Sequence, residues 1–550
     1  MPNPGTTPGA ESHFTISSAD RSVSPPQLTI PRRYNAAADL IGRNLAAGRG
    51  DKPAYVDDYG ICTYSELDRR TSAFANVLNQ LGVQPEQRIL LCLHDTIDFP
   101  TVFLGAIKAG VVPVAINTLL TGADYEYMLT DSRAQVAVVS AALLPLFEPL
   151  RQKAPHLKRL LVSHGPAGPD ALAPLIEAAP TQFPIALTSC DEPCFWLYSS
   201  GSTGAPKGTV HVHASMIQTA ELYAGPVLGI EQSDVVFSAA KLFFAYGLGN
   251  ALSFPMSVGA TTVLMAERPT PAAVFQRMRA HRPTIFCGVP TLYAAMLANA
   301  ELPGREELRL RRCPSAGEAL PEEIGKRWKR HFGVDILDGI GSTEMLHIFL
   351  SNRPEDVRYG TTGRPVPGYE IRLIDDDGRP AAPGVPGELQ VAGPTAAAMY
   401  WNNRDKSRNT FMGTWTRSGD KYTCTEDGYY VYCGRSDDML KVSGLYVSPA
   451  EVEAALVTHE CVLEAAVIGR EDSDRLIKPA AYVVLKPGLS GTPELADRLK
   501  AHVKGLLAPH KYPRWFEFID ELPKTATGKI QRFKLRARVA KIDAGRRNGS

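Results

Sequence analysis

One run of eleven residues rich in Gly, Ser and Thr constrains this chain more than any other segment: Tyr198-Ser-Ser-Gly-Ser-Thr-Gly-Ala-Pro-Lys-Gly208. Its glycines free backbone N–H groups, and its hydroxyls and lysine can surround a polyphosphate. The Walker pattern is not met, because counting from Gly201 a proline stands where the second glycine is required. The run therefore predicts a phosphate-binding loop of another type, with a plain flexible surface loop as the alternative.

The chain as a whole excludes several classes of protein. Its 550 residues exceed what one hydrophobic core can organise, so about three structural units are expected. With 59 basic and 58 acidic side chains the net charge is +1, which favours neither a nucleic-acid nor a membrane partner. No stretch of about eighteen uninterrupted apolar residues predicts a membrane span. The nine cysteines are scattered, which fits free thiols and a cytoplasmic location.

Residues 1–34, rich in Pro, Ser, Thr and Gly, are expected to form a disordered lead-in. From 35 to 434, amphipathic stretches alternate with short β-branched runs, which predicts an α/β fold with largely parallel sheets. We expect a helix over Ser65–Leu81 and strands over Arg88–Leu93, Gln135–Ser140 and Ala260–Met265. Turn-rich sequence between 364 and 387 then predicts a small β-rich subdomain that closes this large N-terminal domain.

Residues 435–550 are expected to form a smaller α+β domain. Its predicted elements are a helix over Ser448–Val457, strands over Val462–Ile468 and Ala480–Leu485, a helix over Ala496–Leu507 and a strand over Trp515–Ile519. The charged junction Arg435–Asp438 indicates a hinge with contacts rather than a flexible tether. The basic tail Lys529–Arg547 is interpreted as a solvated helix face, with binding of a ligand's 3′-phosphate as the alternative.

Six motifs in order resemble those of the adenylate-forming enzymes, the superfamily of acyl-CoA synthetases, peptide-synthetase adenylation domains and firefly luciferase. After the phosphate loop they are Ser315-Ala-Gly-Glu-Ala-Leu320, Asp338-Gly-Ile-Gly-Ser-Thr-Glu344, Arg417-Ser-Gly-Asp420, Gly434-Arg-Ser-Asp-Asp-Met-Leu-Lys-Val-Ser-Gly444 and Pro523-Lys-Thr-Ala-Thr-Gly-Lys-Ile-Gln-Arg532. The segments Lys241–Gly247 and Met345–Phe349 are similar to those of benzoate-CoA ligases. The resemblance implies a large domain of stacked α/β layers, a mobile C-terminal domain, and an active site between them.

The implied reaction joins an aromatic carboxylate, benzoate before other acids, to coenzyme A through an acyl-adenylate made from ATP with Mg²⁺. By the same resemblance, Lys529 is the adenylation lysine, Thr343 contacts the α-phosphate, and Glu344 holds the metal. The implied nucleotide-binding residues are Ser199, Ser200, Ser202, Thr203, Lys207, Gly317, Glu318, Ala319, Asp338, Gly339, Asp420 and Arg435. A carboxylate such as Asp420 can accept from both ribose hydroxyls.

The acyl site is implied at Phe244, Ala245, Tyr246, Gly247, Gly341 and His347, although an ordinary aromatic core is a strong alternative there. Lys441 and Gly444 are implied for the thioester step, and Asp437 for the hinge. Other acids remain open: 2-aminobenzoate, a hydroxybenzoate or a medium-chain fatty acid. So do transfer to a carrier protein and a catalytically silent nucleotide-binding module. The oligomeric state is left open, with a homodimer as one candidate.

Overall fold

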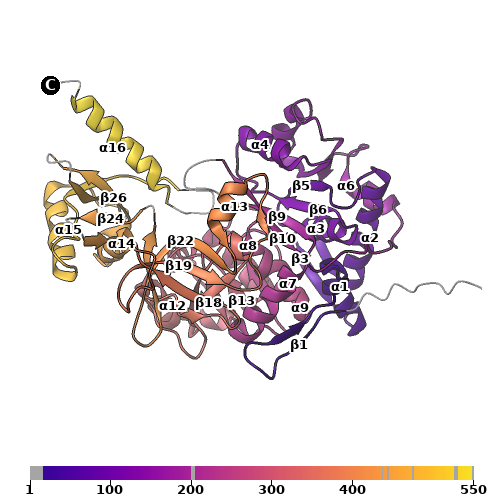
Figure 1. Cartoon of the computed structure of the whole chain (residues 1–550), viewed down its shortest axis with the longest axis horizontal. Helices are drawn as coiled ribbons and strands as arrows, with labels where there is room; N and C mark the ends of the chain where they lie inside the picture. Colours follow the sequence, from indigo (N-terminus) through magenta and orange to yellow (C-terminus); the bar gives the residue numbers. More distant parts are fainter. Residues whose placement is uncertain are drawn as a thin grey trace, which may run out of the picture.

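The computed structural model describes residues 16–199, 205–436, 438–442, 445–472, 476–524 and 530–547. Figure 1 shows layered sheets and helices over most of the chain, with the C-terminal unit at one end of the long axis. The mixed α/β architecture expected from the sequence is confirmed.

The largest sheet has seven strands in the order β20-β10-β9-β6-β5-β7-β8. Neighbours from β9 to β8 are parallel, whereas β10 pairs antiparallel with both β9 and β20. The strands are β5 (Arg88–Cys92), β6 (Val112–Ala115), β7 (Val136–Ser140), β8 (Arg159–Ser163), β9 (Pro193–Ser199), β10 (Lys207–Val212) and β20 (Met399–Tyr400). The chain segment 200–204, part of the predicted phosphate loop, therefore connects the two antiparallel strands β9 and β10.

A second sheet of five strands has the order β13-β11-β12-β3-β4 and is parallel except for the β3–β4 hairpin. Its strands are β3 (Pro53–Asp57), β4 (Gly60–Thr63), β11 (Val235–Ser238), β12 (Thr261–Val263) and β13 (Ile285–Cys287). The helices around the two sheets are α1 (Ala36–Ala46), α2 (Tyr64–Gln80), α3 (Asp98–Lys108), α4 (Gly122–Ser132), α5 (Leu144–Phe147), α6 (Leu172–Ala178), α7 (Ala214–Thr219), α9 (Phe254–Val258), α10 (Pro271–His281), α11 (Pro290–Leu297) and α12 (Glu322–Phe332).

Helix α2 shows how local sequence sets these elements. Its N-terminus is capped by Thr63, whose hydroxyl accepts a hydrogen bond from the backbone N–H of Glu66 at 3.2 Å. Apolar residues at helical spacing, including Leu67, Phe74 and Leu78, are fully buried. The helix expected over Ser65–Leu81 is thus confirmed to within one residue at each end.

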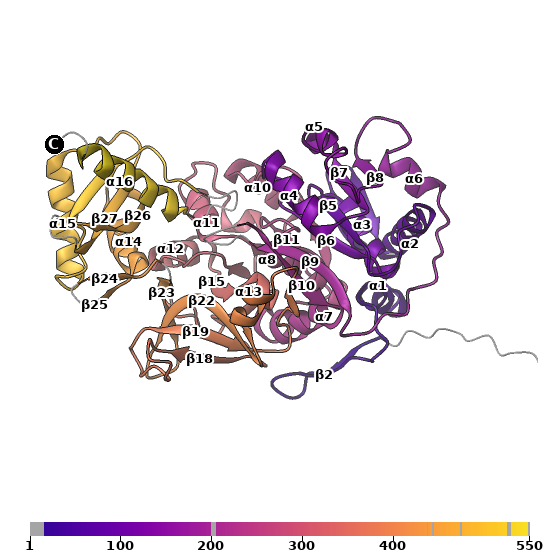
Figure 2. The same cartoon turned by 45° about the horizontal axis from the view of Figure 1, so that its top comes forward.

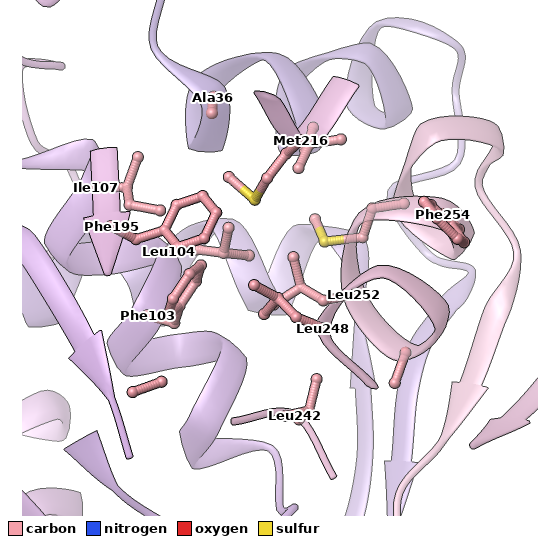
Figure 3. Packing of buried hydrophobic residues seen from close by; sticks show 14 of the residues in the cluster. Ala36, Phe103, Leu104, Ile107, Phe195, Met216, Leu242, Leu248, Leu252 and Phe254 are labelled. Atoms are coloured by element: carbon pink, nitrogen blue, oxygen red, sulfur yellow. The ribbon is translucent and has the colours of Figure 1, made fainter. Parts of the chain in front are cut away.

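The main core lies between the two sheets. Figure 3 shows Phe103 and Leu104 of α3 facing Phe195 of β9, with Met216 of α7 and Leu252 completing the packing. These side chains come from segments distant in sequence, so the core fixes the two sheets against each other. It also supports the segment 241–254 that carries the expected acyl-site residues.

Two smaller sheets follow. One contains β14 (Cys313–Ser315), β15 (Ile336–Gly341), β16 (Ile348–Ser351) and β17 (Arg364–Pro365). The other is antiparallel and contains β18 (Glu370–Ile374), β19 (Gly387–Ala392), β21 (Phe411–Met412), β22 (Trp415–Cys424) and β23 (Tyr430–Arg435), with α13 (Arg404–Thr410) beside it. The β-rich unit expected before residue 430 is therefore present, and its last strand, β23, extends it to Arg435.

The C-terminal unit is built on a three-stranded sheet, β26 (Val462–Glu471), β27 (Ile477–Leu485) and β28 (Trp515–Phe518), beside the hairpin of β24 (Leu440–Val442) and β25 (Leu445–Val447). Alternate residues of β26 face opposite sides. Val467 packs with α14 (Pro449–Val457) and α15 (Pro493–Leu506), whereas Ile468 packs with Leu535 of α16 (Arg532–Arg547). Figure 2 shows α16 beside β26 and β27.

One expectation needs correction, and a second gains detail. Within the expected disordered lead-in 1–34, residues 18–20 (β1) and 27–29 (β2) form a two-stranded antiparallel sheet, held to the body by the Arg21–Glu221 ion pair at 2.6 Å. In the basic tail, Arg532, Arg536 and Arg538 are each paired with a carboxylate of the same C-terminal unit. Among the described residues, no helix is both long and apolar enough to cross a membrane.

Candidate active site

Lys207, Glu344 and Tyr400 form a charged cluster where β10, β20 and the short helix η6 (Thr343–Met345) meet. The Tyr400 hydroxyl donates to Glu344 Oε1 at 2.7 Å, and Lys207 Nζ lies 4.5 Å from the centre of the Tyr400 ring. Burial raises the pKa of Tyr400 and the Glu344 carboxylate adds to this, so the hydroxyl remains a donor. Burial lowers the pKa of Lys207, which Glu344 opposes. Two residues predicted from separate motifs are therefore brought together.

His211 holds the backbone of the predicted α-phosphate residue. Its Nε2 donates to the Thr343 carbonyl at 2.7 Å, which requires the Nε2–H form of the ring. The imidazole is fully buried, and burial lowers its pKa to about 4, so the ring is neutral at pH 7. His211 thus joins β10 to η6, the short helix that contains Thr343 and Glu344.

This geometry predicts that His211 makes folding more sensitive to acid. Because its folded pKa of about 4 lies below the ordinary 6.5, the neutral ring stabilises the fold fully above pH 6.5 and loses this contribution as the pH falls toward 4. We expect His211→Gln, whose amide can still donate to Thr343, to reduce the loss of unfolding free energy between about pH 7.5 and pH 5 by roughly 2 kcal/mol. Urea denaturation of both proteins measures this, and equal pH dependences would contradict it.

Asp420 and Arg435 lie opposite each other on β22 and β23, joined by an ion pair of 3.1 Å. Asp420 is buried while the Arg435 side chain is partly exposed. The backbone N–H of Asp420 donates to the Ser418 hydroxyl at 3.0 Å, which fixes the turn that presents the carboxylate. The expected ribose acid and its neighbouring cation are thus adjacent, and Arg435 also acts electrostatically on Lys207.

Asp338 and Gly339 lie in β15, next to β14 with Ser315 opposite Asp338. Asp338 is buried, and burial raises its pKa well above the ordinary value despite hydrogen bonds that lower it. The turn after β14 contains Gly317, Glu318 and Ala319, and Gly317 has a positive φ of 97°, which favours glycine there. The residues expected to form the adenine slot therefore lie in the middle of β15 and in the turn that follows its neighbour β14.

His347 is the centre of an aromatic group. Its ring lies 4.4 Å from Phe254, 5.2 Å from Tyr223 and 5.5 Å from Tyr246, measured between centroids. Its Nε2 is 3.3 Å from the Tyr246 carbonyl, and burial lowers the pKa of the ring to about 3. His347 is therefore a neutral, packed imidazole within three residues of Glu344.

The segment around Tyr246 is wound unusually. Phe244 precedes α8 (Ala245–Leu248), which runs into a π-helix over Gly249–Ser253; a second π-helix spans Ala220–Leu228 and carries Tyr223. π-Helical turns are rare and often occur at functional sites. Gly247 has no room for a side chain, since a Cβ would lie 2.0 Å from the Lys241 carbonyl oxygen, and one on Gly341 would lie 2.4 Å from that of His347.

Sequence reasoning missed several residues. Tyr400 and Tyr223 belong to no motif and are identified only by the contacts above. Asp95 is also buried, at the carboxyl end of β5, and accepts from the Leu242 N–H at 3.2 Å. Burial raises its pKa to about 6, an effect that Lys241 opposes. The signal for Asp95 was its place directly after a buried parallel strand, where functional polar groups gather.

Some predicted residues lie outside the described part of the chain. These are Ser200, Ser202, Thr203, Asp437, Gly444 and Lys529. The backbone of Lys441 lies in β24, and Ser199 ends β9.

Glu344 also fits the expected role in holding Mg²⁺. This cation is commonly bound through one or two carboxylates together with substrate phosphates, rather than by a cage of protein ligands. The described residues contain no group of three or more His, Cys, Asp or Glu side chains that could hold a metal ion. One oxygen of Glu344 accepts from Tyr400, which orients the carboxylate.

The fold and this set of residues define the class of protein. The chain belongs to the AMP-binding enzyme family: the family's AMP-binding enzyme domain matches residues 43–401, and its C-terminal domain matches residues 451–529. The resemblance to adenylate-forming enzymes is thereby confirmed.

Individual proteins similar to this chain have more specific names than the family. The chain is 67% identical to a benzoate–CoA ligase of Thauera aromatica, across 95% of this chain and all of that protein. It is 51% identical to a 4-hydroxybenzoate–CoA/benzoate–CoA ligase of Rhodopseudomonas palustris, across 92% and 94% of the two chains. Among solved structures, a benzoate CoA ligase from Burkholderia xenovorans LB400 matches with a TM-score of 0.86 and 58% identity, covering 92% of this chain and 100% of the other. The anthranilate CoA ligase AuaEII gives a TM-score of 0.89 with 43% identity, covering 93% and 98%.

Proposed function

We propose that this protein ligates an aromatic carboxylate, with benzoate favoured, to coenzyme A through an acyl-adenylate, releasing pyrophosphate and then AMP. The observation that carries this proposal is the group of aromatic rings packed around the neutral His347, which follows Glu344 by three residues. If these rings wall the acyl site, an apolar surface suited to a flat ring would adjoin the charged groups expected to bind the nucleotide. The 67% identity to a benzoate–CoA ligase over nearly the whole chain supports the choice of acid.

In the first half-reaction, a carboxylate oxygen attacks the α-phosphorus of ATP and pyrophosphate leaves. Three negative groups must be neutralised at once, so fixed positive charge is the main requirement. Lys207 would bind the phosphates, Asp420 would accept from the ribose hydroxyls, and Lys529 would bridge the carboxylate and the α-phosphate. Mg²⁺, when held by Glu344, would supply further charge on the phosphate oxygens.

In the second half-reaction, the CoA sulfur attacks the acyl carbon, the thiol proton is lost and AMP leaves. Rotation of the C-terminal domain about Asp437 would remove Lys529 and bring Lys441 and Gly444 to the site. The absence of a side chain at Gly444 would let the backbone approach the pantetheine closely. The nine free cysteines support a cytoplasmic setting for this chemistry.

The choice of acid can be tested on the wall of the acyl site. If Ala245 lines a slot for a flat ring, Ala245→Leu should overfill it and cost about 1–3 kcal/mol of transition-state binding for benzoate, with little change in the KM for ATP. Measured as AMP formation with CoA, kcat/KM should favour benzoate over octanoate by a wide margin in the wild type.

A panel of benzoate, 2-aminobenzoate, 3- and 4-hydroxybenzoate and octanoate ranks the remaining acids. Leu248→Ala, a change in a fully buried neighbour of the same helix, serves as the control for general loss of packing. Unchanged benzoate kinetics in Ala245→Leu, or equal use of octanoate and benzoate by the wild type, would refute the assigned pocket.

A further inference from the structure

A cluster of four charged side chains lies where the C-terminal unit begins. Arg532, the first residue of α16, donates from Nη2 to both carboxylate oxygens of Glu453 in α14, at 2.8 and 2.7 Å. Its Nη1 is 3.5 Å from Asp438 Oδ2. Arg536, one helical turn further on, donates to Asp438 Oδ1 at 2.7 Å. Asp438 and α16, which are nearly a hundred residues apart in sequence, are thus joined with α14 by two guanidinium groups and two carboxylates.

Three of the four side chains are sheltered from water, and Arg536 is partly exposed. The side chains of Arg532, Glu453 and Asp438 are 18%, 13% and 12% exposed. Burial acts to lower the pKa of Arg532, but Glu453 and Asp438 outweigh it and leave that pKa raised. Glu453 is fixed in turn, because its Oε1 also accepts from the backbone N–H of Val467 in β26 at 2.6 Å. A partly buried network of this kind is rigid where an exposed pair would be loose.

The same cluster is close in sequence to two residues with proposed roles, the hinge residue Asp437 and the adenylation residue Lys529. On one side, Asp438 is next in sequence to Asp437, and its backbone N–H donates to the Arg435 carbonyl at 3.0 Å. On the other, Arg532 follows Lys529 by three residues. The residues that flank 525–529 are paired: Lys524 and Ile530 form an antiparallel bridge, and the Gln531 N–H donates to the Pro523 carbonyl at 2.7 Å.

We propose that Arg532 is a positioning residue for adenylation. Through Glu453 and Asp438 it holds the start of α16, which follows the segment that carries Lys529, at the junction about which the C-terminal domain turns. This inference rests on the adenylating role proposed for Lys529. Rotation at the junction then moves Lys529 with it as one body, and loss of the cluster leaves the lysine present but misplaced. A small misplacement of a catalytic group is enough to cost about a hundredfold in rate.

The test compares Arg532→Gln with Arg538→Gln, a matched control on the same helix whose ion pair with Glu517 is more exposed. Pyrophosphate release from benzoate and ATP measures adenylation, and thioester formation from supplied benzoyl-AMP and CoA measures the second step. Arg532→Gln should slow adenylation by about 10- to 100-fold through kcat, and change the second step less than about twofold. Arg538→Gln should leave both steps unchanged.

A double variant separates positioning from stability. Because Arg532 acts through Lys529, adding Arg532→Gln to Lys529→Ala should cause no further loss of adenylation, whereas a purely structural defect would add to it. Arg532→Lys, which keeps the charge but not the fork, should give an intermediate loss and carries the test if Arg532→Gln does not fold. Parallel loss of both half-reactions, or additive loss in the double variant, overturns the proposal. A Lys529→Ala enzyme without a selective adenylation defect would instead refute the role of Lys529 itself.

Discussion

Lys529→Ala is expected to slow adenylation about a thousandfold, because it removes a fixed charge from a group that becomes more negative in the transition state. Conversion of supplied benzoyl-AMP and CoA to the thioester should proceed at close to the wild-type rate. The selectivity follows from the proposed alternation, in which Lys529 is needed only while the carboxylate attacks the α-phosphorus. Rapid-quench measurement of each half-reaction gives the two rates separately.

The matched control for this variant is Lys524→Ala. Lys524 belongs to the same motif, yet its ammonium is paired with Glu464 at 2.5 Å within the C-terminal unit. It should therefore leave adenylation within a few-fold of the wild type. If Lys529→Ala lowered both half-reactions equally while retaining the wild-type melting temperature, the lysine would have been assigned the wrong role.

Asp437→Pro is the second substitution with a large expected effect. Proline holds φ near −65° and restricts the residue before it, so the junction would be confined to a narrow set of conformations. We expect adenylation to survive and the thioester step to fall by about a hundredfold or more, since the second orientation of the C-terminal domain could no longer be reached.

Asp437→Ala separates the backbone effect from the charge. It removes the carboxylate but leaves φ free, and should retain both half-reactions. Limited proteolysis with and without benzoyl-AMP gives a structural readout, because a fixed junction should give the same cleavage pattern in both conditions. Wild-type rates for both steps in Asp437→Pro would show that this chain does not need rotation there.

Local signals in the sequence were sufficient for the regular elements. The helix near Ser65 and the strands near Arg88 and Val136 were predicted within a residue or two, because capping and apolar periodicity act over a few positions. The β1–β2 pair was missed for the opposite reason. Its strands are short, and their neighbour Arg21 pairs with Glu221, two hundred positions away, a contact that composition alone does not reveal.

The candidate site shows the same difference between local sequence signals and long-range contacts. The ordered motifs named Lys207 and Glu344, since each motif carries a side chain suited to a phosphate or a metal, and the fold brings these two side chains near each other. Tyr400 was not predicted, because its role arises from the pairing of β20 with β10, which places a lone tyrosine between two motifs. His347 was singled out, whereas its partner Tyr223 was not, since an aromatic residue in an apolar helix has the appearance of ordinary core.

The two π-helices beside His347 have a consequence for how such a site can diverge. A π-turn holds one more residue than an α-turn, so deleting a single residue from 220–228 or 249–253 would restore regular winding. Because the wider turn absorbs the extra residue, side chains beyond the deletion would largely keep their faces, while those within the turn would change their directions. Tyr223 and its neighbours would be exchanged as a set, whereas a point substitution alters one wall at a time. New acid preferences are therefore accessible to this scaffold through changes in length as well as in residue type.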